Sequence, residues 1–240
     1  MRLDKFICKS TELNRHQASE CIDRGEISVN GGVVTDVRFQ VHESNEVLYR
    51  GLRLVARPSR YIMLHKPIHT LSSNVDGDYP SLFRCIDIER VEDLHIVGRL
   101  DADTTGLVLL TDDGRWSFDI IRPDKQCEKT YRVTLRDPIG GDEAADMIAR
   151  FKHGLQLQNE QALTLPAILK VVTEKEVLLT ITEGKYHQVK RMFAAVGNRV
   201  NGLHREQIGD LNLDVTVGNW RYLTDVEVNR LSTPTPQSKA

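Results

Sequence analysis

The sequence lacks the features that are typical of exported, membrane-spanning, disulfide-bonded or zinc-binding proteins. Its 240 residues include only four cysteines, which lie far apart without paired spacing, and this argues against a disulfide framework and a zinc site. No uninterrupted apolar run is long enough to span a membrane. The N-terminal stretch MRLDKFICKS places Asp4 where a signal peptide needs apolar residues. We therefore expect a cytoplasmic protein with reduced cysteines and no membrane partner.

Net charge is also nearly absent, because the formal charge at pH 7 is -2, and this value does not favour a general nucleic-acid binder. The charges are unevenly distributed, however. The segment from Gly184 to Arg205 contains several basic residues and no acidic residue, whereas acidic residues collect near Asp87 to Asp93 and Asp137 to Asp146. This asymmetry permits a local anionic partner.

The first part of the chain, residues 1–57, is predicted to form two short helices followed by a hairpin. Asn14 is a candidate N-cap with Gln17 three residues later, which is the pattern of a capping box. Gly25 is suited to end that helix. The pair Asn30-Gly31, between two alternating segments, is typical of a tight hairpin turn.

Two patterns in this segment, RLDKF and R-x-x-A-x-x-x-I-x-x-G-x-I-x-V-N-G, are more specific than its elements. Together they resemble the alpha-L RNA-binding module. The resemblance implies contacts from basic side chains to RNA phosphates, with Lys5, Arg15 and Arg24 as the expected contact residues. The alternative is that these charges only form a solvated helical face.

Residues 58–60 are predicted to be a linker, and a second domain is expected over residues 61–232. Its short segments are rich in branched residues, are bounded by turn formers and indicate strands. Helices are expected at Asp142–Lys152, His187–Val196 and Thr224–Leu231, and Asp113-Gly114 is expected to form a turn. Strands and helices do not alternate regularly, so we predict an α+β fold around a mostly antiparallel sheet. Residues 233–240 are predicted to be a disordered tail.

Four stretches of the second domain carry a further resemblance: GRLDADTTGLVLLTDDG, YIMLHKP, CEKTYRVTL and EGKYHQVKRMFAAVGN. In this order, behind an RNA-binding module, they resemble the pseudouridine synthases of the RsuA type. The resemblance implies isomerisation of one uridine of 16S ribosomal RNA, expected to be uridine 516. Because that reaction exchanges no electrons or external groups, no cofactor or metal is expected. The expected partner is small-subunit RNA or a partly assembled small subunit, and nothing in the sequence demands more than a monomer.

The same resemblance assigns residues to the chemistry. Asp101 would carry the chemistry, either as the nucleophile or by acting on the 2′ proton of the ribose. Tyr131 would lie beneath the uracil, and Arg99 would assist extraction of the base. An ionised carboxylate near the ribose can stabilise the developing positive charge or attack it, and it needs a cation to stay ionised. Lys190 flanks the apolar face of its predicted helix and is expected to supply that cation. Further RNA contacts are expected from Lys129, His187 and Arg191.

Each of these residues has a simpler alternative. Asp101 could cap a turn or form a salt bridge, and Asp103, before two threonines, is expected to accept hydrogen bonds from its own turn. Tyr131 could be an ordinary core residue. Lys190 could lay its stem along the core edge, and Arg99 could pair with Asp103.

Three other functions also remain open from the sequence. The first is a pseudouridine synthase for a 23S ribosomal RNA site. The second is a non-catalytic RNA-binding factor in ribosome assembly. The third is a hydrolase that uses Asp101 and Asp103 as an acid/base pair, because side chains two residues apart in an extended segment share a face.

Overall fold

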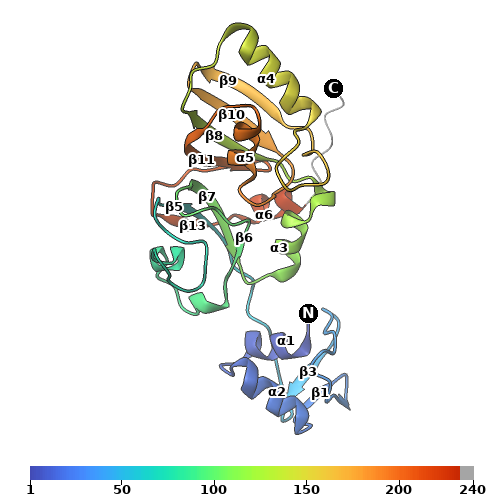
Figure 1. Ribbon diagram of the computed structural model, residues 1–240. Coiled ribbons are helices and arrows are strands. Elements are labelled where there is room, and N and C mark those ends of the chain that lie inside the picture. Colours follow the sequence, from blue (N-terminus) through green and yellow to red (C-terminus); the bar gives the residue numbers. More distant parts are fainter. Residues whose placement is uncertain (233–240) are drawn as a thin grey trace. The chain divides into compact units, whose positions relative to one another are not determined.

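The computed structural model describes residues 1–232, which form two compact units (Figure 1). The first unit comprises Met1–Ser59, and the second begins at Arg60. The predicted disordered tail, 233–240, lies outside the described residues. Within residues 1–232, no helix combines the length and apolar character needed to cross a membrane.

The first unit packs two helices against a small antiparallel sheet. Its elements are α1 (Leu3–Ser10), α2 (Arg15–Asp23), β1 (Ile27–Val29), β2 (Gly32–Val33), β3 (Val47–Tyr49) and β4 (Leu52–Arg53). The strand order is β2-β1-β3-β4, with every neighbouring pair antiparallel. The two helices and the hairpin expected from the sequence are therefore present.

The local signals for these elements act as predicted. The Asn14 side chain accepts from the Gln17 backbone N–H at 3.0 Å, and the Gln17 side chain accepts from the Asn14 N–H at 2.9 Å, which completes the capping box. After α2 the chain turns at Gly25 with φ of 70°. Asn30 and Gly31 both have positive φ, at 50° and 82°, as a tight hairpin requires.

One charged side chain is buried in the first unit. Asp4 is 1% exposed, and its carboxylate accepts from Arg2 Nη2 at 2.9 Å, from Arg15 Nε at 3.2 Å and from the Lys5 backbone N–H at 2.9 Å. Two guanidinium groups therefore compensate the buried negative charge.

The second unit is built on a nine-stranded sheet. Its strands are β5 (Tyr61–Lys66), β6 (His95–Val97), β7 (Thr105–Thr111), β8 (Lys129–Leu135), β9 (Ile168–Thr173), β10 (Glu176–Ile181), β11 (Val200–Ile208), β12 (Leu211–Asn212) and β13 (Trp220–Tyr222). The main order is β13-β5-β7-β11-β8-β10-β9, with β12 paired to β11 and β6 to β7. Only the β7–β11 pair among these strands is parallel. This confirms the predicted α+β class and mostly antiparallel sheet.

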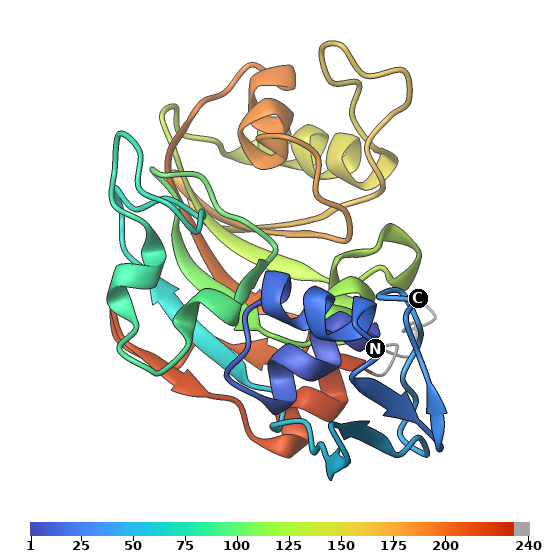
Figure 2. The same cartoon turned by 90° about the horizontal axis from the view of Figure 1, so that it is seen from below.

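Helices cover both faces of this sheet (Figure 2). They are α3 (Gly114–Ile121), α4 (Gly141–His153), α5 (Gln188–Ala195) and α6 (Asp225–Ser232), with short 3-10 turns η1 (Leu82–Cys85), η2 (Val91–Asp93) and η3 (Pro123–Lys125). Helices α4 and α5 lie on one face, and α3 and α6 lie on the other. The apolar run of β7 contributes to a hydrophobic core on each face of the sheet. Val108 and Leu110 belong to the core with α4 and α5, and Leu107 and Leu109 belong to the core with α3 and α6.

Helix α3 was not expected from the sequence, which favoured a turn at Asp113-Gly114. Asp113 instead caps α3, since its Oδ1 accepts from the Arg115 N–H at 2.9 Å and the Trp116 N–H at 3.2 Å. Aspartate followed by glycine is compatible with a turn or with a helix start. Burial of Trp116 and Ile120 against the sheet decides for the helix.

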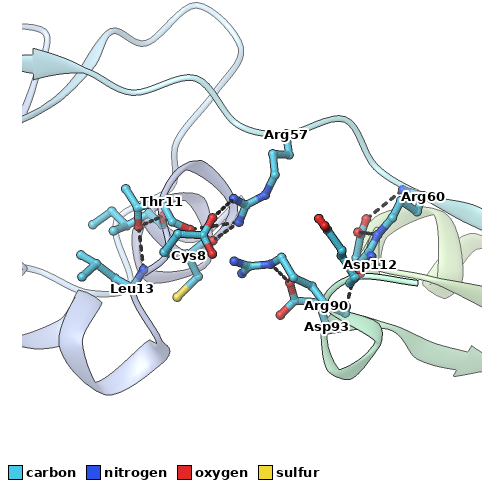
Figure 3. A network of polar contacts seen from close by, with 11 residues as sticks. Cys8, Thr11, Leu13, Arg57, Arg60, Arg90, Asp93 and Asp112 are labelled. Atoms are coloured by element: carbon cyan, nitrogen blue, oxygen red, sulfur yellow. Dashed lines mark hydrogen bonds and ion pairs between the residues drawn. The ribbon is translucent and has the colours of Figure 1, made fainter. Parts of the chain in front are cut away.

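Arg57, just before the predicted linker, and Arg60, the last residue of that linker, are each held by their own unit (Figure 3). Arg57 Nη2 donates to the carbonyls of Cys8 at 2.7 Å and Thr11 at 3.0 Å in the first unit. Arg60 donates from its backbone and its Nε to the two Asp112 oxygens, at 3.0 Å and 2.8 Å, in the second. Only Pro58 and Ser59 separate these two arginines in the sequence.

Candidate active site

The loop between β6 and β7 carries the two carboxylates that precede the apolar run. Ser72 fixes its entry, because the Ser72 hydroxyl donates to the Leu100 carbonyl at 2.8 Å and accepts from the Leu100 N–H at 3.0 Å. The carboxylates themselves are accessible: the Asp101 side chain is 32% exposed and that of Asp103 is 62% exposed. The strand is buried, but its two acids lie at the surface of the unit.

Lys190, on α5, joins both acids. Its Nζ donates to Asp101 Oδ2 at 2.9 Å and to Asp103 Oδ1 at 2.6 Å. Burial opposes the charged form of this amine, but the two carboxylates outweigh burial and raise the pKa of Lys190. Burial likewise opposes ionisation of Asp103, and Lys190 more than offsets it, so the pKa of Asp103 is lowered. The expected Lys190–Asp101 contact is present.

The position of Lys190 follows from the sequence of α5. Val189, Met192 and Phe193 are buried on one face of the helix, and Gly197, with φ of 86°, follows its end. Lys190 lies beside this apolar face and so reaches the loop. Its stem is partly buried, but its ammonium is paired with carboxylates.

A second basic side chain approaches Asp101 from the start of the same helix. His187 Nε2 lies 3.3 Å from Asp101 Oδ1. The Asp101 carboxylate therefore faces Lys190 with one oxygen and His187 with the other. His187 was expected from the sequence as an RNA contact, and its proximity to Asp101 was not anticipated.

Lys66 supports the loop from inside the protein. Its side chain is fully buried, and its Nζ donates to the carbonyls of Thr104 at 2.8 Å, Pro67 at 3.0 Å and Ala102 at 3.4 Å. Burial lowers the pKa of Lys66 to about 8, and the charges of Asp103 and Asp101 oppose that lowering. The stretch YIMLHKP contained this residue, but a lysine at the end of a strand gives no sequence signal for burial.

Arg205, on β11, is the second buried cation and is 1% exposed. It donates from Nε to the Leu107 carbonyl at 2.7 Å, from Nη2 to the Gly98 carbonyl at 2.6 Å and from Nη1 to the Tyr131 hydroxyl at 3.4 Å. One guanidinium thus joins three elements: strand β7, the chain just before the Asp101 loop, and Tyr131. Sequence reasoning counted Arg205 only as part of a basic segment.

A glycine permits this arrangement. Arg205 lies opposite Gly106 on β7 and opposite Tyr131 on β8. A Cβ atom at Gly106 would lie 2.3 Å from the Arg205 carbonyl oxygen, and Gly106 has a φ of 112°. Only glycine allows so close an approach between the two parallel strands.

Tyr131 is 7% exposed and belongs to the main core of the second unit. Its ring also faces the Arg205 guanidinium, with 5.9 Å from the guanidinium carbon to the ring centroid. The residue is thus a core aromatic whose hydroxyl contacts the buried arginine that also binds Gly98. The structure links Tyr131 to the loop of Asp101 through this arginine.

The remaining residues of the second unit that are predicted to contact RNA differ in whether their side chains are exposed or bound to other protein groups. Arg99 is exposed, and among residues 1–232 no ion pair joins it to Asp103, whose partner is Lys190. Arg191 was expected to reach a phosphate, but it donates to Glu160 Oε1 at 3.0 Å and to the Gln158 carbonyl at 2.5 Å. The Lys129 ammonium donates to the Cys127 carbonyl at 3.0 Å, and burial lowers the pKa of Lys129.

The expectation that Asp103 accepts a hydrogen bond from its own turn holds in part, because a hydrogen bond from its own backbone helps to lower its pKa, but the carboxylate also has a distant partner. Its Oδ1 accepts from Lys190, and Thr105 Oγ1 instead lies 2.7 Å from His204 Nδ1. The sequence could not show this, because Lys190 is 87 residues away along the chain.

The three basic residues predicted to bind RNA in the first unit lie at its surface. Lys5 is exposed, as are the side chains of Arg15 and Arg24, at 67% and 61%. Arg15 is tied to Asp4, and Arg24 lies 3.6 Å from Glu20.

No metal site accompanies these groups. Across the described part of the chain, no three His, Cys, Asp or Glu side chains are grouped so that they could hold a metal ion. The four cysteines, all of which lie in the described residues, form no disulfide.

Two family models match the chain. One, described as RNA pseudouridylate synthase, matches residues 60–195, and the other, described as S4 domain, matches residues 1–47. Two relatives are ribosomal small subunit pseudouridine synthases A. That of Vibrio cholerae is 49% identical, over 95% of this chain and 98% of the relative. That of Escherichia coli is 46% identical, over 95% and 98%. A crystal structure of a pseudouridylate synthase is 43% identical and covers 96% of this chain and 99% of its own, with a TM-score of 0.69.

Proposed function

The chain belongs to the RNA pseudouridylate synthase family, and from this premise we propose that it converts one uridine of small-subunit ribosomal RNA to pseudouridine. The expected target is uridine 516 of 16S ribosomal RNA. Support for a small-subunit substrate comes from the relatives, which are small-subunit synthases and match this chain over nearly their whole length. The S4 domain in the first unit supplies a second RNA-binding element.

The reaction needs no external reactant. The bond from the ribose to the uracil nitrogen breaks, the base turns, and a bond from the ribose to a uracil carbon forms. The proton lost from that carbon is matched by one gained at the nitrogen, so no electrons are exchanged. The residues of this chain therefore have to bind the base, stabilise charge on the sugar and move protons.

Asp101 carries the chemistry in this proposal. The observation that supports it is the arrangement around its carboxylate, with Lys190 2.9 Å from one oxygen and His187 3.3 Å from the other. A neighbouring cation favours the ionised carboxylate, which can then attack the ribose or accept a proton. The 32% exposure of Asp101 leaves the group reachable by a nucleotide drawn out of its stack.

The other residues act around that carboxylate. We propose that Tyr131 supports the uracil and that Arg99, which is exposed and directly follows Gly98 in the chain, assists extraction of the base. Lys190 supplies the positive charge that pairs with the Asp101 carboxylate. The exposed basic residues of the first unit, together with Lys129, His187 and Arg191 where RNA frees them from protein partners, would contact the RNA. We further propose that the enzyme works as a monomer in the cytoplasm, with residues 1–57 as the RNA-binding domain and 61–232 as the catalytic domain.

The test is incubation with small-subunit RNA transcript, with and without ribosomal proteins, followed by mapping of the isomerised uridine. Asp101→Asn should lower the rate by at least about a thousandfold and retain RNA binding. Asp103→Asn is the matched control: it also removes a Lys190 partner but should keep most of the activity. An Asp101→Asn protein with unchanged rate would refute the role of Asp101. Modification only in large-subunit RNA would refute the proposed substrate.

A further inference from the structure

The chain just before α5 presents an aromatic ring to solvent next to the proposed nucleophile. Tyr186 is 76% exposed, and its ring is stacked on the His187 imidazole, with centroids 3.8 Å apart and planes inclined by 21°. His187 in turn lies 3.3 Å from Asp101. The free face of the Tyr186 ring is therefore separated from Asp101 by a single residue.

This segment is held in place before any ligand binds. The Gln188 side chain accepts from the Lys185 N–H at 2.8 Å and donates to Glu183 at 2.7 Å. The Tyr186 carbonyl accepts from Arg191 Nη1 at 3.1 Å. Because these contacts already order the backbone, a partner that stacks on Tyr186 causes little further loss of conformational entropy in this segment.

The charges beside the ring do not make it an anion site. Lys185 Nζ donates to Glu160 Oε2 at 2.8 Å, and Arg191 Nη1 donates to the other oxygen of the same carboxylate at 3.0 Å. The feature left available is the flat face of the phenol ring. A nucleobase is a flat partner that this face fits, and stacking needs no particular base.

A second stacked pair touches the same loop. The rings of His69 and Tyr79 lie 5.1 Å apart with planes inclined by 19°, and the His69 N–H donates to the Ala102 carbonyl at 2.8 Å. Tyr79 is 40% exposed. Two successive residues of the loop, Asp101 and Ala102, thus each contact a histidine whose ring is stacked on an exposed tyrosine.

We propose that the Tyr186 ring, backed by His187, is the stacking site for a nucleobase adjacent to the uridine on which Asp101 acts. This inference rests on the proposed function. Extraction of a uridine leaves its neighbours without a stacking partner, and a fixed aromatic surface beside the site replaces that partner. The binding energy so gained favours the extracted state of the RNA without touching the reacting atoms.

The test compares wild type, Tyr186→Ala, Tyr186→Phe and Phe118→Ala in single-turnover reactions over a range of RNA concentrations. Phe118 is the matched control, because it is an exposed aromatic (59%) on α3. Tyr186→Ala should raise the half-saturating RNA concentration roughly tenfold, which is the order expected from losing one base–aromatic stack. Its rate at saturation and its melting temperature should stay near those of wild type. Tyr186→Phe and Phe118→Ala should match wild type throughout, since stacking needs the ring and not its hydroxyl.

A spectroscopic readout isolates the stack itself. RNAs with 2-aminopurine on either side of the mapped uridine should lose fluorescence on binding wild type at one of the two positions, and Tyr186→Ala should abolish that quenching. An unchanged half-saturating concentration in Tyr186→Ala would overturn the inference. A reduced saturating rate alone would also overturn it, because Tyr186 would then act through His187 and Asp101. Absence of pseudouridine with wild type would instead overturn the proposed function and, with it, this inference.

Discussion

The two units of the molecule bury charge in opposite ways. In the first unit the buried carboxylate of Asp4 is matched by guanidinium groups of Arg2 and Arg15. In the second unit the buried cations Lys66 and Arg205 bind mainly backbone carbonyls, with no carboxylate among their hydrogen-bond partners in the described residues. Asp4 thus stabilises a fold locally, whereas the two cations leave positive charge uncompensated by direct pairing.

That difference indicates what each unit is built to do. Burying a cation without a counter-ion costs free energy, so carbonyl contacts alone are an expensive way to stabilise a fold. Both cations, however, contact the loop of Asp101 or the residues that enter and leave it. The positive charge beneath this loop attracts anionic groups, which include the Asp101 and Asp103 carboxylates. We interpret the buried cations as supports of the reaction and Asp4 as a support of the fold.

Among the changes that test this comparison of the two units, removing the charge of Lys66 is expected to have the largest effect. Lys66→Met leaves the Ala102 and Thr104 carbonyls without this donor, and the loop that carries Asp101 loses its internal support. Displacement of a reacting group by about 1 Å can cost on the order of a hundredfold in rate. We expect the single-turnover rate on small-subunit RNA to fall about a hundredfold with RNA affinity maintained.

The control for Lys66→Met uses the two tryptophans, Trp116 and Trp220, which both lie in the second unit. Their fluorescence follows unfolding of that unit alone. A folded Lys66→Met protein with wild-type rate would refute the proposed role of Lys66. It would also leave Arg205 as the single buried cation of the second unit, among the described residues, that is assigned to the reaction.

A smaller loss of rate is expected when Arg205 is replaced by lysine, which keeps the positive charge but not the planar guanidinium. Lysine cannot reproduce the planar set of donors that binds Leu107, Gly98 and Tyr131 together. Arg205→Lys should lower the saturating rate about tenfold, the order expected for one or two lost hydrogen bonds. Arg205→Met should lose more activity, because the charge is removed as well. Equal rates for the lysine and methionine variants would show that charge at this position is irrelevant.

The contrast predicts a different outcome for Asp4. Asp4→Asn weakens the pairing with Arg2 and Arg15 and should destabilise the first unit by about 1–3 kcal/mol. Circular dichroism should record this loss, while the unfolding transition seen by tryptophan fluorescence stays in place. The rate at saturating RNA should remain within about twofold of wild type, with any change confined to RNA affinity. A reduced saturating rate would place Asp4 among the supports of the reaction.

Sequence patterns predicted those parts of the molecule that depend on neighbouring residues. The capping box at Asn14, the turn at Asn30-Gly31 and the amphipathic face beside Lys190 all arise from local spacing, and the structure contains each of them. Helix α3 was missed because burial of Trp116 against the sheet, and not the sequence at its start, selects the helix. Local signals therefore identified most elements but left competing conformations open where tertiary packing decides.

The candidate site divides in the same way. The Lys190–Asp101 pair could be anticipated because a functional carboxylate needs a cation and the helix face positioned one. Lys66 and Arg205 could not, since nothing local distinguishes a buried cation from a solvated one. Arg205 depends on Gly106 and Tyr131, which lie on neighbouring strands and far away in sequence. Strand register, which the sequence does not specify, brings these residues together.

The last expected effect is a pH dependence of stability that belongs to Lys66. Its folded pKa of about 8 lies below the ordinary value of 10.5, so between these pH values the unfolded chain keeps a proton that the folded protein has released. Stability from this group therefore rises with pH across that window, and the full cost of the buried ammonium applies below it. Denaturant unfolding followed by tryptophan fluorescence should show wild type gaining stability relative to Lys66→Met from about pH 8 upward. Parallel profiles for the two proteins would mean that Lys66 keeps its proton, and a relative loss for wild type would mean that its carbonyl contacts require the charge.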